Sequence, residues 1–218
     1  SDLVIDIGAG DSFSDIYGQK RLNLMFASKF LAHGRRLPVI LAPQTIGPFK
    51  NPVNRHIAAR HLSLCRAVFA RDELSLAALR DLGAGERSFL ASDVALELPY
   101  DLPAPRPAGG PVRVGLNVSG LLMNGGYTRS NMFGLKDSYP ELIDALIHDF
   151  TAREGVELHL VGHVLSEKHE VEDDGRASQA LAERHPGVVL APHFASPSAA
   201  KSYIAGLDFF AGARMHAT

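Results

Sequence analysis

Residues 37–70 read LPVILAPQTIGPFKNPVNRHIAARHLSLCRAVFA, and this stretch decides the fold class. The apolar run from Leu37 to Ala42 predicts a buried strand, followed by a proline-containing loop over residues 43–49. Asn51 followed by Pro52 is typical of a helix N-cap and first helical position, so we expect a helix from there to about Cys65. A second apolar run at residues 67–70 completes a strand–helix–strand unit, which indicates a parallel sheet.

The same alternation continues on both sides of this stretch. Further strands are expected at residues 3–7, 89–90, 112–118, 156–161, 188–191 and 207–211, and further helices at residues 21–32, 72–83, 142–153, 177–184 and after Ser196. Five prolines and two glycines between residues 99 and 111 mark a linker. We therefore predict two doubly wound, Rossmann-like α/β domains, residues 1–98 and 112–218, joined by a linker at residues 99–111. Ligands of such sheets bind at the carboxyl ends of the strands, and a cleft between two such domains would suit two substrates.

The composition excludes several classes of protein. Among 218 residues, 22 are Lys or Arg and 24 are Asp or Glu, so there is no basic surplus for non-specific nucleic-acid binding. Cys65 is the one cysteine, which rules out an intramolecular disulfide, and its apolar neighbours predict a buried, inert thiol. No apolar run approaches the roughly 18 residues of a membrane span, and no signal peptide opens the chain.

Polar loops follow the strands of the first half. After the first strand come Gly8 and Gly10, which allow close approach of a ligand, and Asp11, Ser12 and Asp15, which offer groups for sugar hydroxyls. Alone, this Gly-x-Gly pattern also fits a plain tight turn, and it lacks the third glycine of a dinucleotide site.

Two further strand ends carry candidate residues. Gln44 and Thr45 follow the second strand, where a merely rigid connection is the alternative. Arg71 follows the third strand and suits a carboxylate or phosphate, unless it pairs with Asp72 or another acid.

The second half repeats the arrangement. Asn117 and Ser119 end its first strand, and a long polar loop with Arg129 follows, which is typical of a functional or a mobile segment. His163 stands just past the next strand. The acids at residues 172–174 fit a solvated helix start, and without His-x-His, HExxH or CxxC spacing no metal site is predicted.

The last strand leads into Gly212-Ala213-Arg214-Met215-His216-Ala217-Thr218. In an extended segment Arg214 and His216 share one face. A fixed cation beside a titratable imidazole suits an anionic substrate that must receive a proton. A structural arginine with a capping histidine is the alternative reading.

Taken in order, GAGDSFSDIYG, APQTIGPF, FARDELS, SDVAL, NVSGLL and DFFAGARMHAT resemble the polysaccharide pyruvyl transferase family over almost the whole chain. The resemblance implies a fold like that of the two-domain B-type glycosyltransferases. It also implies phosphoenolpyruvate as donor and a ketal-linked pyruvate on a cell-surface polysaccharide or its lipid-linked precursor. Arg214 matches the family arginine that contacts phosphoenolpyruvate, and His216 matches the proposed acid/base. Family members begin with a further strand and continue past the RMHAT element, so the second domain is expected to be incomplete here.

The resemblance suggests a mechanism without a metal or other cofactor. His216 as imidazolium would protonate the methylene carbon of phosphoenolpyruvate, and Arg214, with Arg71 or Arg129, would hold its carboxylate and phosphate. The implied partners are the donor and a saccharide acceptor, with a cytoplasmic location and, for a lipid-linked acceptor, peripheral contact with the inner face of the membrane. A B-type glycosyltransferase with a nucleotide-sugar donor and a non-catalytic carbohydrate-binding protein remain the alternatives.

Overall fold

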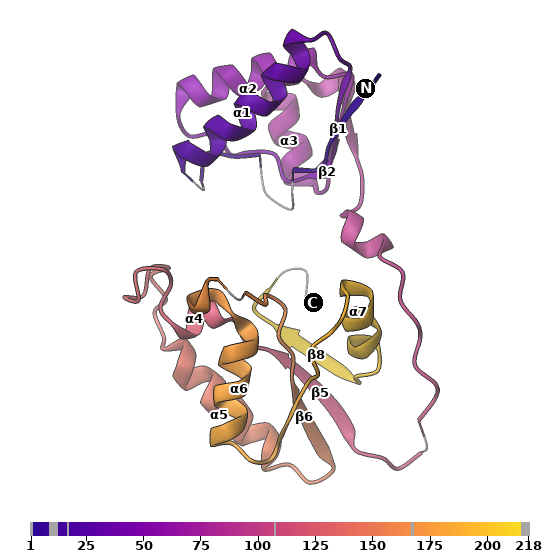
Figure 1. The fold of residues 1–218 in the computed structure, drawn as a ribbon, viewed down its shortest axis with the longest axis vertical. Helices are drawn as coiled ribbons and strands as arrows, with labels where there is room; N and C mark the ends of the chain where they lie inside the picture. Colours follow the sequence, from indigo (N-terminus) through magenta and orange to yellow (C-terminus); the bar gives the residue numbers. More distant parts are fainter. Residues whose placement is uncertain (1, 9–12, 17, 107, 167, 215–218) are drawn as a thin grey trace. The chain divides into compact units, whose positions relative to one another are not determined.

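A computed structural model of the chain describes residues 2–8, 13–16, 18–106, 108–166 and 168–214. Within it the chain divides into two compact units, Ser1–Glu97 and Leu98–Thr218, hereafter the first and the second unit. Each has its own parallel sheet and its own apolar core (Figure 1). No helix in the described part of the chain is long and apolar enough to cross a membrane.

The first unit is a run of alternating strands and helices. Its elements in chain order are β1 (Val4–Asp6), α1 (Gln19–Gly34), β2 (Val39–Gln44), α2 (Pro52–Leu64), β3 (Ala67–Ala70), α3 (Glu73–Asp81), the 3-10 turn η2 (Gly85–Arg87), β4 (Ser88–Leu90) and the 3-10 turn η3 (Val94–Glu97). The four strands are parallel and lie in the order β1-β2-β3-β4. All three crossovers therefore step in the same direction, and since such crossovers are right-handed, they place their helices on one face. Figure 1 shows α1, α2 and α3 together on one side of this sheet.

The two faces of this sheet differ in exposure. Val39, Leu41 and Val68 are fully buried against the helices. On the opposite face Ile5 and Phe89 are exposed, and the ring of Phe89 stacks on that of Phe69 at 5.4 Å between centroids. The described part of this unit is thus a helical layer on one side of the sheet and an apolar surface on the other.

Local capping chemistry explains where the helices begin. The Asn51 side chain accepts hydrogen bonds from the N–H groups of Val53 and Asn54, and that of Asp72 accepts one from Ser75. The cap at Asn51 was predicted from the sequence and is confirmed. β2 continues to Gln44, two residues further than predicted, with a register shift between Leu41 and Gln44 around Pro43, which has no N–H to donate to the ladder.

The second unit begins with the proline-rich segment. Residues 98–106 and 108–111 form no helix or strand, and they contact the last part of the unit: Lys201 Nζ donates to the Leu98 carbonyl oxygen, and Arg106 pairs with Asp208. The elements that follow are β5 (Val112–Asn117), α4 (Gly120–Met123), α5 (Tyr139–Thr151), β6 (Val156–Leu160), the 3-10 turn η4 (Glu170–Glu172), α6 (Asp174–Arg184), β7 (Val188–Leu190), α7 (Pro197–Ala205) and β8 (Phe209–Gly212).

The strand order of the second sheet is β7-β6-β5-β8, all parallel. The chain moves outward from β5 to β7 and then crosses to the other side of β5 to form β8. Figure 1 shows α5 and α6 on one side of this sheet and α7 on the other, as this reversal requires. The carboxyl ends of β5 and β8 therefore flank a topological switch point, where doubly wound sheets bind their ligands. The two Rossmann-like units confirm the predicted α/β fold class.

Candidate functional site

The described residues among the predicted site residues lie at the ends of strands or in the loops that follow them, in both units. Gly8, Asp15, Gln44, Thr45 and Arg71 follow or end strands of the first unit. In the second unit the described candidates are Asn117, Ser119, Arg129, His163 and Arg214. Gly10, Asp11, Ser12 and His216 lie outside the described residues.

Gly8 and Gln44 form a close contact at the ends of β1 and β2. Gly8 has a φ of 65°, and a Cβ there would lie 2.8 Å from Gln44 Oε1, so a side chain does not fit. The buried Gln44 amide donates from Nε2 to the carbonyl oxygens of Asp6 and Ala42, both at 3.3 Å, while its Oε1 is a buried acceptor without a hydrogen-bond partner among the described residues. Such orphaned acceptors are uncommon in protein interiors. Thr45 next to it is half-buried.

Asp15 connects its loop to the start of α2. Its carboxylate accepts hydrogen bonds from the backbone N–H groups of Lys50 at 3.0 Å and Asn51 at 2.9 Å. Burial by itself would raise the pKa of Asp15, but these hydrogen bonds outweigh it and hold the pKa below its ordinary value. The carboxylate is therefore charged and held in place, and its role toward a sugar remains a prediction.

Arg71 is engaged with acids of its own unit. Its Nη1 lies 3.0 Å from Asp93 Oδ2, and its Nε lies 4.0 Å from Asp72 Oδ2. The ion pair that the sequence left open as an alternative is thus present. Because the guanidinium is largely buried beside Asp93, it is a weaker candidate for an anionic substrate than a less engaged arginine would be.

Arg214 lies two residues past β8 and is held by a buried carboxylate. Its Nε donates to Asp174 Oδ2 at 3.2 Å, and its Nη2 donates to Asp174 Oδ1 at 2.8 Å. The same Nη2 donates to the Glu172 carbonyl oxygen at 3.1 Å. Only Nη1 has no partner among the described residues, so two N–H donors of this guanidinium are available to a ligand.

Asp174 collects several hydrogen bonds besides those of Arg214. Its Oδ1 accepts from the Gly120 N–H at 2.8 Å, and its Oδ2 accepts from the Val164 N–H at 3.0 Å. Complete burial by itself would raise the pKa of Asp174, but the hydrogen bonds from Arg214, Val164 and Gly120 keep that pKa below its ordinary value. Asp174 is therefore a carboxylate at neutral pH, and it offsets the charge of Arg214.

Asn117 and Ser119 are buried and bonded within the second unit. Asn117 Oδ1 accepts from the backbone N–H of Arg214 at 3.2 Å, and its Nδ2 donates to the Val161 carbonyl oxygen at 2.9 Å. Ser119 Oγ accepts from the Leu122 N–H and caps α4. Their geometry fixes the ends of β5, β6 and β8 relative to one another; contact with a substrate remains a prediction for both.

His163 and Arg129 are the exposed candidates of this unit. The backbone N–H of His163 donates to Asp174 Oδ2 at 3.3 Å, which places this histidine on the loop that also ends at Asp174. Arg129 has a φ of 54° and is exposed in the polar loop, and its side chain makes no hydrogen bond within the described part of the chain. This loop is tied to η4 by Tyr127, whose hydroxyl donates to Glu172 Oε2 at 2.6 Å.

Asp174, the residue that binds Arg214, was not singled out from the sequence. A solvated acidic helix start was expected at residues 172–174, but Asp173 and Asp174 are buried, which corrects that expectation. Asp173 caps α6 by accepting a hydrogen bond from the Arg176 N–H, so the carboxylate of Asp174 is not needed as a helix cap. The available signal was a second acid directly after a sufficient cap, followed by Gly175. The backbone of Gly175 packs so closely on Gly162 that a Cβ on Gly162 would lie 3.2 Å from the Gly175 nitrogen.

A group of side chains in the first unit resembles a metal site without fitting one. His33 Nε2 lies 2.8 Å from His61 Nδ1, and His61 Nε2 lies 3.5 Å from Cys65 Sγ. His61 thus faces its two neighbours with different ring nitrogens, whereas one ion binds one nitrogen of a ring. The nitrogen–nitrogen distance is also shorter than the roughly 3.3 Å edge of a tetrahedral zinc site. These residues form a hydrogen-bonded chain instead.

The titration behaviour agrees with that assignment. Burial, together with the charges of Lys29 and His33, lowers the pKa of His61 to about 3. Burial raises the pKa of the Cys65 thiol to about 12. Both groups are therefore neutral at pH 7. The expectation that Cys65 is buried is confirmed, and an inert thiol at this position remains a prediction.

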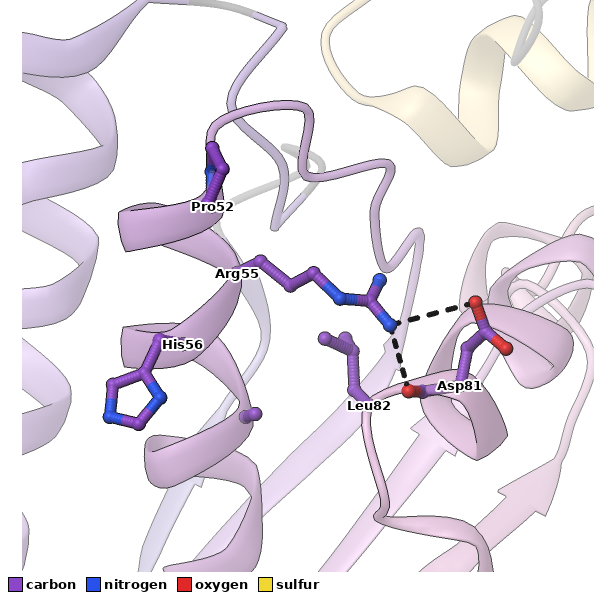
Figure 2. A pocket seen from close by; sticks show the side chains of 6 residues that line it. Pro52, Arg55, His56, Asp81 and Leu82 are labelled. Carbon is purple, nitrogen blue, oxygen red and sulfur yellow. Dashed lines mark hydrogen bonds and ion pairs between the residues drawn. The ribbon is translucent and has the colours of Figure 1, made fainter.

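A surface hollow of the first unit lies beside the start of α2 and the end of α3 (Figure 2). Within it Arg55 Nη2 donates to the Asp81 carbonyl oxygen at 2.9 Å and lies 3.7 Å from Asp81 Oδ2. The lining residues are Pro52, Arg55, His56, Ala59, Asp81 and Leu82. None of the predicted site residues is among them, so this hollow is separate from the strand ends that carry the candidate chemistry.

The strongest arrangement is thus a guanidinium at a switch point that is held by a buried carboxylate, and no described residue binds its Nη1. Such a group can donate to an oxygen of a phosphate or carboxylate. A comparison with protein families matches residues 1–218 to the family described as Polysaccharide pyruvyl transferase. A search of curated proteins found no match.

Proposed function

Since the chain belongs to the polysaccharide pyruvyl transferase family, we propose that it transfers the pyruvyl group of phosphoenolpyruvate to a saccharide of a cell-surface polysaccharide or its precursor. The observation that carries this proposal is Arg214, placed just past β8 with Nη1 unused. A doubly anionic donor needs such a cation at the ligand end of a sheet.

On the donor side, Arg214 is assigned one anionic group of phosphoenolpyruvate. The two N–H groups of Nη1 point about 120° apart, so they cannot both bind the two oxygens of one phosphate or carboxylate. Nη1 can bind one oxygen of an anionic group, and the other group needs a second cation. Arg129 is the first choice within the same unit because its side chain is exposed, whereas Arg71 is engaged with Asp93. In this assignment two arginines of the second unit bind the two anionic groups of phosphoenolpyruvate separately.

The proposed reaction is an addition followed by a substitution. The His216 imidazolium gives a proton to the methylene carbon, and a sugar hydroxyl oxygen bonds to the adjacent carbon while its proton returns to His216. The carbon–oxygen bond to phosphate then breaks, a second hydroxyl oxygen bonds to the same carbon, and its proton leaves with the phosphate. The products are the pyruvate ketal and inorganic phosphate. Arg214 offsets the charge that builds up on the departing group.

On the acceptor side the proposal rests on the first unit. Gln44 Oε1 is a buried acceptor to which no donor of the described residues binds, and Asp15 is a charged carboxylate at the end of the same sheet. Together with Thr45, Gly8 and the loop residues Gly10, Asp11 and Ser12, they are the proposed sugar contacts. The reaction is assigned to the cytoplasm, where phosphoenolpyruvate is made, and a lipid-linked acceptor would bring it to the inner face of the membrane.

The test is release of inorganic phosphate from phosphoenolpyruvate by the full-length gene product, with a panel of acceptor glycans. We expect release that depends on the acceptor and that falls about 10²-fold or more in Arg214→Lys, because lysine cannot reproduce the paired donors of guanidinium. Arg153→Lys is the matched control, since Arg153 pairs with Asp149 on the exposed end of α5.

Two other results would contradict the proposal. Thermal stabilisation by UDP- or GDP-sugars but not by phosphoenolpyruvate would favour a glycosyltransferase. Binding of glycans with no phosphate release from phosphoenolpyruvate under any condition would favour a carbohydrate-binding protein.

A further inference from the structure

We propose that Asp174 is the positioning residue of Arg214: it holds the guanidinium edge-on, so that Nη1 alone is presented to the anionic substrate. The inference deepens the proposed function and rests on it for the identity of the substrate. The orientation of Arg214 by Asp174 involves only residues of the second unit, so it can be measured without an enzymatic assay.

The pairing of Arg214 with Asp174 has the geometry of a fixed fork. Two parallel hydrogen bonds join Nε to Oδ2 at 3.2 Å and Nη2 to Oδ1 at 2.8 Å. The remaining N–H of Nη2 is taken by the Glu172 carbonyl oxygen at 3.1 Å, and the backbone N–H by Asn117 Oδ1 at 3.2 Å. Three of the five guanidinium donors are therefore committed, and the plane of the group is fixed by contacts on two of its edges.

Asp174 is itself held from several elements, which makes it a rigid support. Its carboxylate accepts from the N–H of Gly120 at the start of α4 and from those of His163 and Val164 after β6. Asn117 Nδ2 at the end of β5 adds a longer contact of 3.4 Å. Because the side chain is fully buried, water does not compete for these hydrogen bonds. The carboxylate thus joins the ends of β5, β6 and β8 at one point.

This arrangement has a specific electrostatic consequence. The pair is neutral overall, so Arg214 attracts an anion through two directed N–H groups more than through net charge. Removing the carboxylate would strengthen the local positive charge but release the guanidinium from its orientation. A misplacement of about 1 Å costs on the order of 10²-fold in rate. We therefore expect a loss in kcat with little change in KM for phosphoenolpyruvate.

The test is a kinetic double-mutant cycle in the full-length protein with Asp174→Asn, Arg214→Lys and the double variant. Asp174→Asn should lower kcat about 10–100-fold and change KM by less than about 3-fold. If Asp174 acts through Arg214, the substitution should have no further effect in the Arg214→Lys background. Asp173→Asn is the control, because asparagine also caps a helix, and it should keep wild-type kcat. Additive losses in the cycle would overturn the positioning role.

A second measurement does not depend on activity or on the folding of Asp174→Asn. The Nε–H of Arg214 is identified in the proton–nitrogen spectrum as the side-chain signal lost in Arg214→Lys. In the wild-type protein it should exchange with water at least about 10-fold more slowly than an exposed arginine such as Arg153, since it is bonded to a buried carboxylate. An Nε–H that exchanges as fast as that of Arg153 would overturn the proposal. Absence of phosphate release in the wild type would instead overturn the proposed function, and this spectrum would still decide the positioning.

Discussion

The buried ion pair between Lys29 and Asp6 predicts that removing the carboxylate costs more stability than removing the ammonium group. Lys29 Nζ on α1 contacts Asp6 Oδ2 at the end of β1, and the side chains are 3% and 19% exposed. Asp6 also accepts from the Gly8 N–H at 2.8 Å. Burial by itself would raise the pKa of Asp6, but the hydrogen bonds from Lys29 and Gly8 outweigh it and lower the pKa. Each charge is therefore stabilised by the other. Water can solvate Asp6 more easily than Lys29, because the Lys29 side chain is less exposed.

The asymmetry follows from what each substitution leaves behind. Asp6→Asn leaves a buried ammonium group without its counter-charge and should cost about 3–5 kcal/mol. Lys29→Met keeps the packing of the stem near Phe13 and leaves a carboxylate that retains the Gly8 N–H and some water, so it should cost about 1–3 kcal/mol. The double variant removes both charges and should lie within about 1 kcal/mol of the wild type.

Urea unfolding followed by far-ultraviolet circular dichroism would measure these differences. The transition of the second unit serves as an internal reference, because the pair lies within the first unit. Arg153→Met breaks an exposed pair and should change stability by about 0.5 kcal/mol or less. A loss for Asp6→Asn no larger than that for Lys29→Met, or a double variant as unstable as the sum of the single ones, would refute the reasoning.

Three further outcomes are expected. The pKa of His61 in the folded state is lowered to about 3, so on acidification the unfolded chain binds a proton before the folded chain does. The stabilisation from neutral His61 should therefore be complete above pH 6.5, and the free energy of unfolding should fall by about 2 kcal/mol between pH 7 and pH 5. Urea midpoints measured at both pH values should show a smaller pH dependence in His61→Leu. His216→Ala should leave the affinity for phosphoenolpyruvate largely intact and lower turnover about 10²–10⁴-fold; unchanged phosphate release would remove His216 from the mechanism. Gln44→Met should raise KM for the saccharide about 10-fold, since it deletes an acceptor that the described chain does not use, and an unchanged acceptor KM would exclude Gln44 from sugar binding. Because methionine also lacks the N–H groups that Gln44 donates to Asp6 and Ala42, the melting temperature should fall by about 4 °C or more.

The fold was predictable because its signals are local. The caps at Asn51 and Asp72 depend on one or two backbone N–H groups nearby in sequence, and the apolar runs depend on strand period, so both are visible without tertiary information. The continuation of β2 to Gln44 was missed because a neighbouring strand, and not the residue type, decides whether an extended segment past a proline joins the sheet.

The sequence predicts which strand ends carry the candidate site. It does not predict which side chains pair with one another there. Arg214 stood out because a cation past the last strand of a parallel sheet has few structural uses. Asp174 did not, because an acid in the first turn of a helix already has a local explanation in the helix dipole. Its burial and its contact with a residue 40 positions later arise only when β8 crosses to the far side of β5.

The crossing that creates this site also decides when it can form. Arg214 lies 97 residues after Asn117, whose side chain binds its backbone N–H, whereas Val161 just past the end of β6 lies 44 residues after Asn117. Closing the longer loop costs more conformational entropy. We therefore expect β5 and β6 to pair first during folding, and the guanidinium to reach Asp174 only when β8 joins β5.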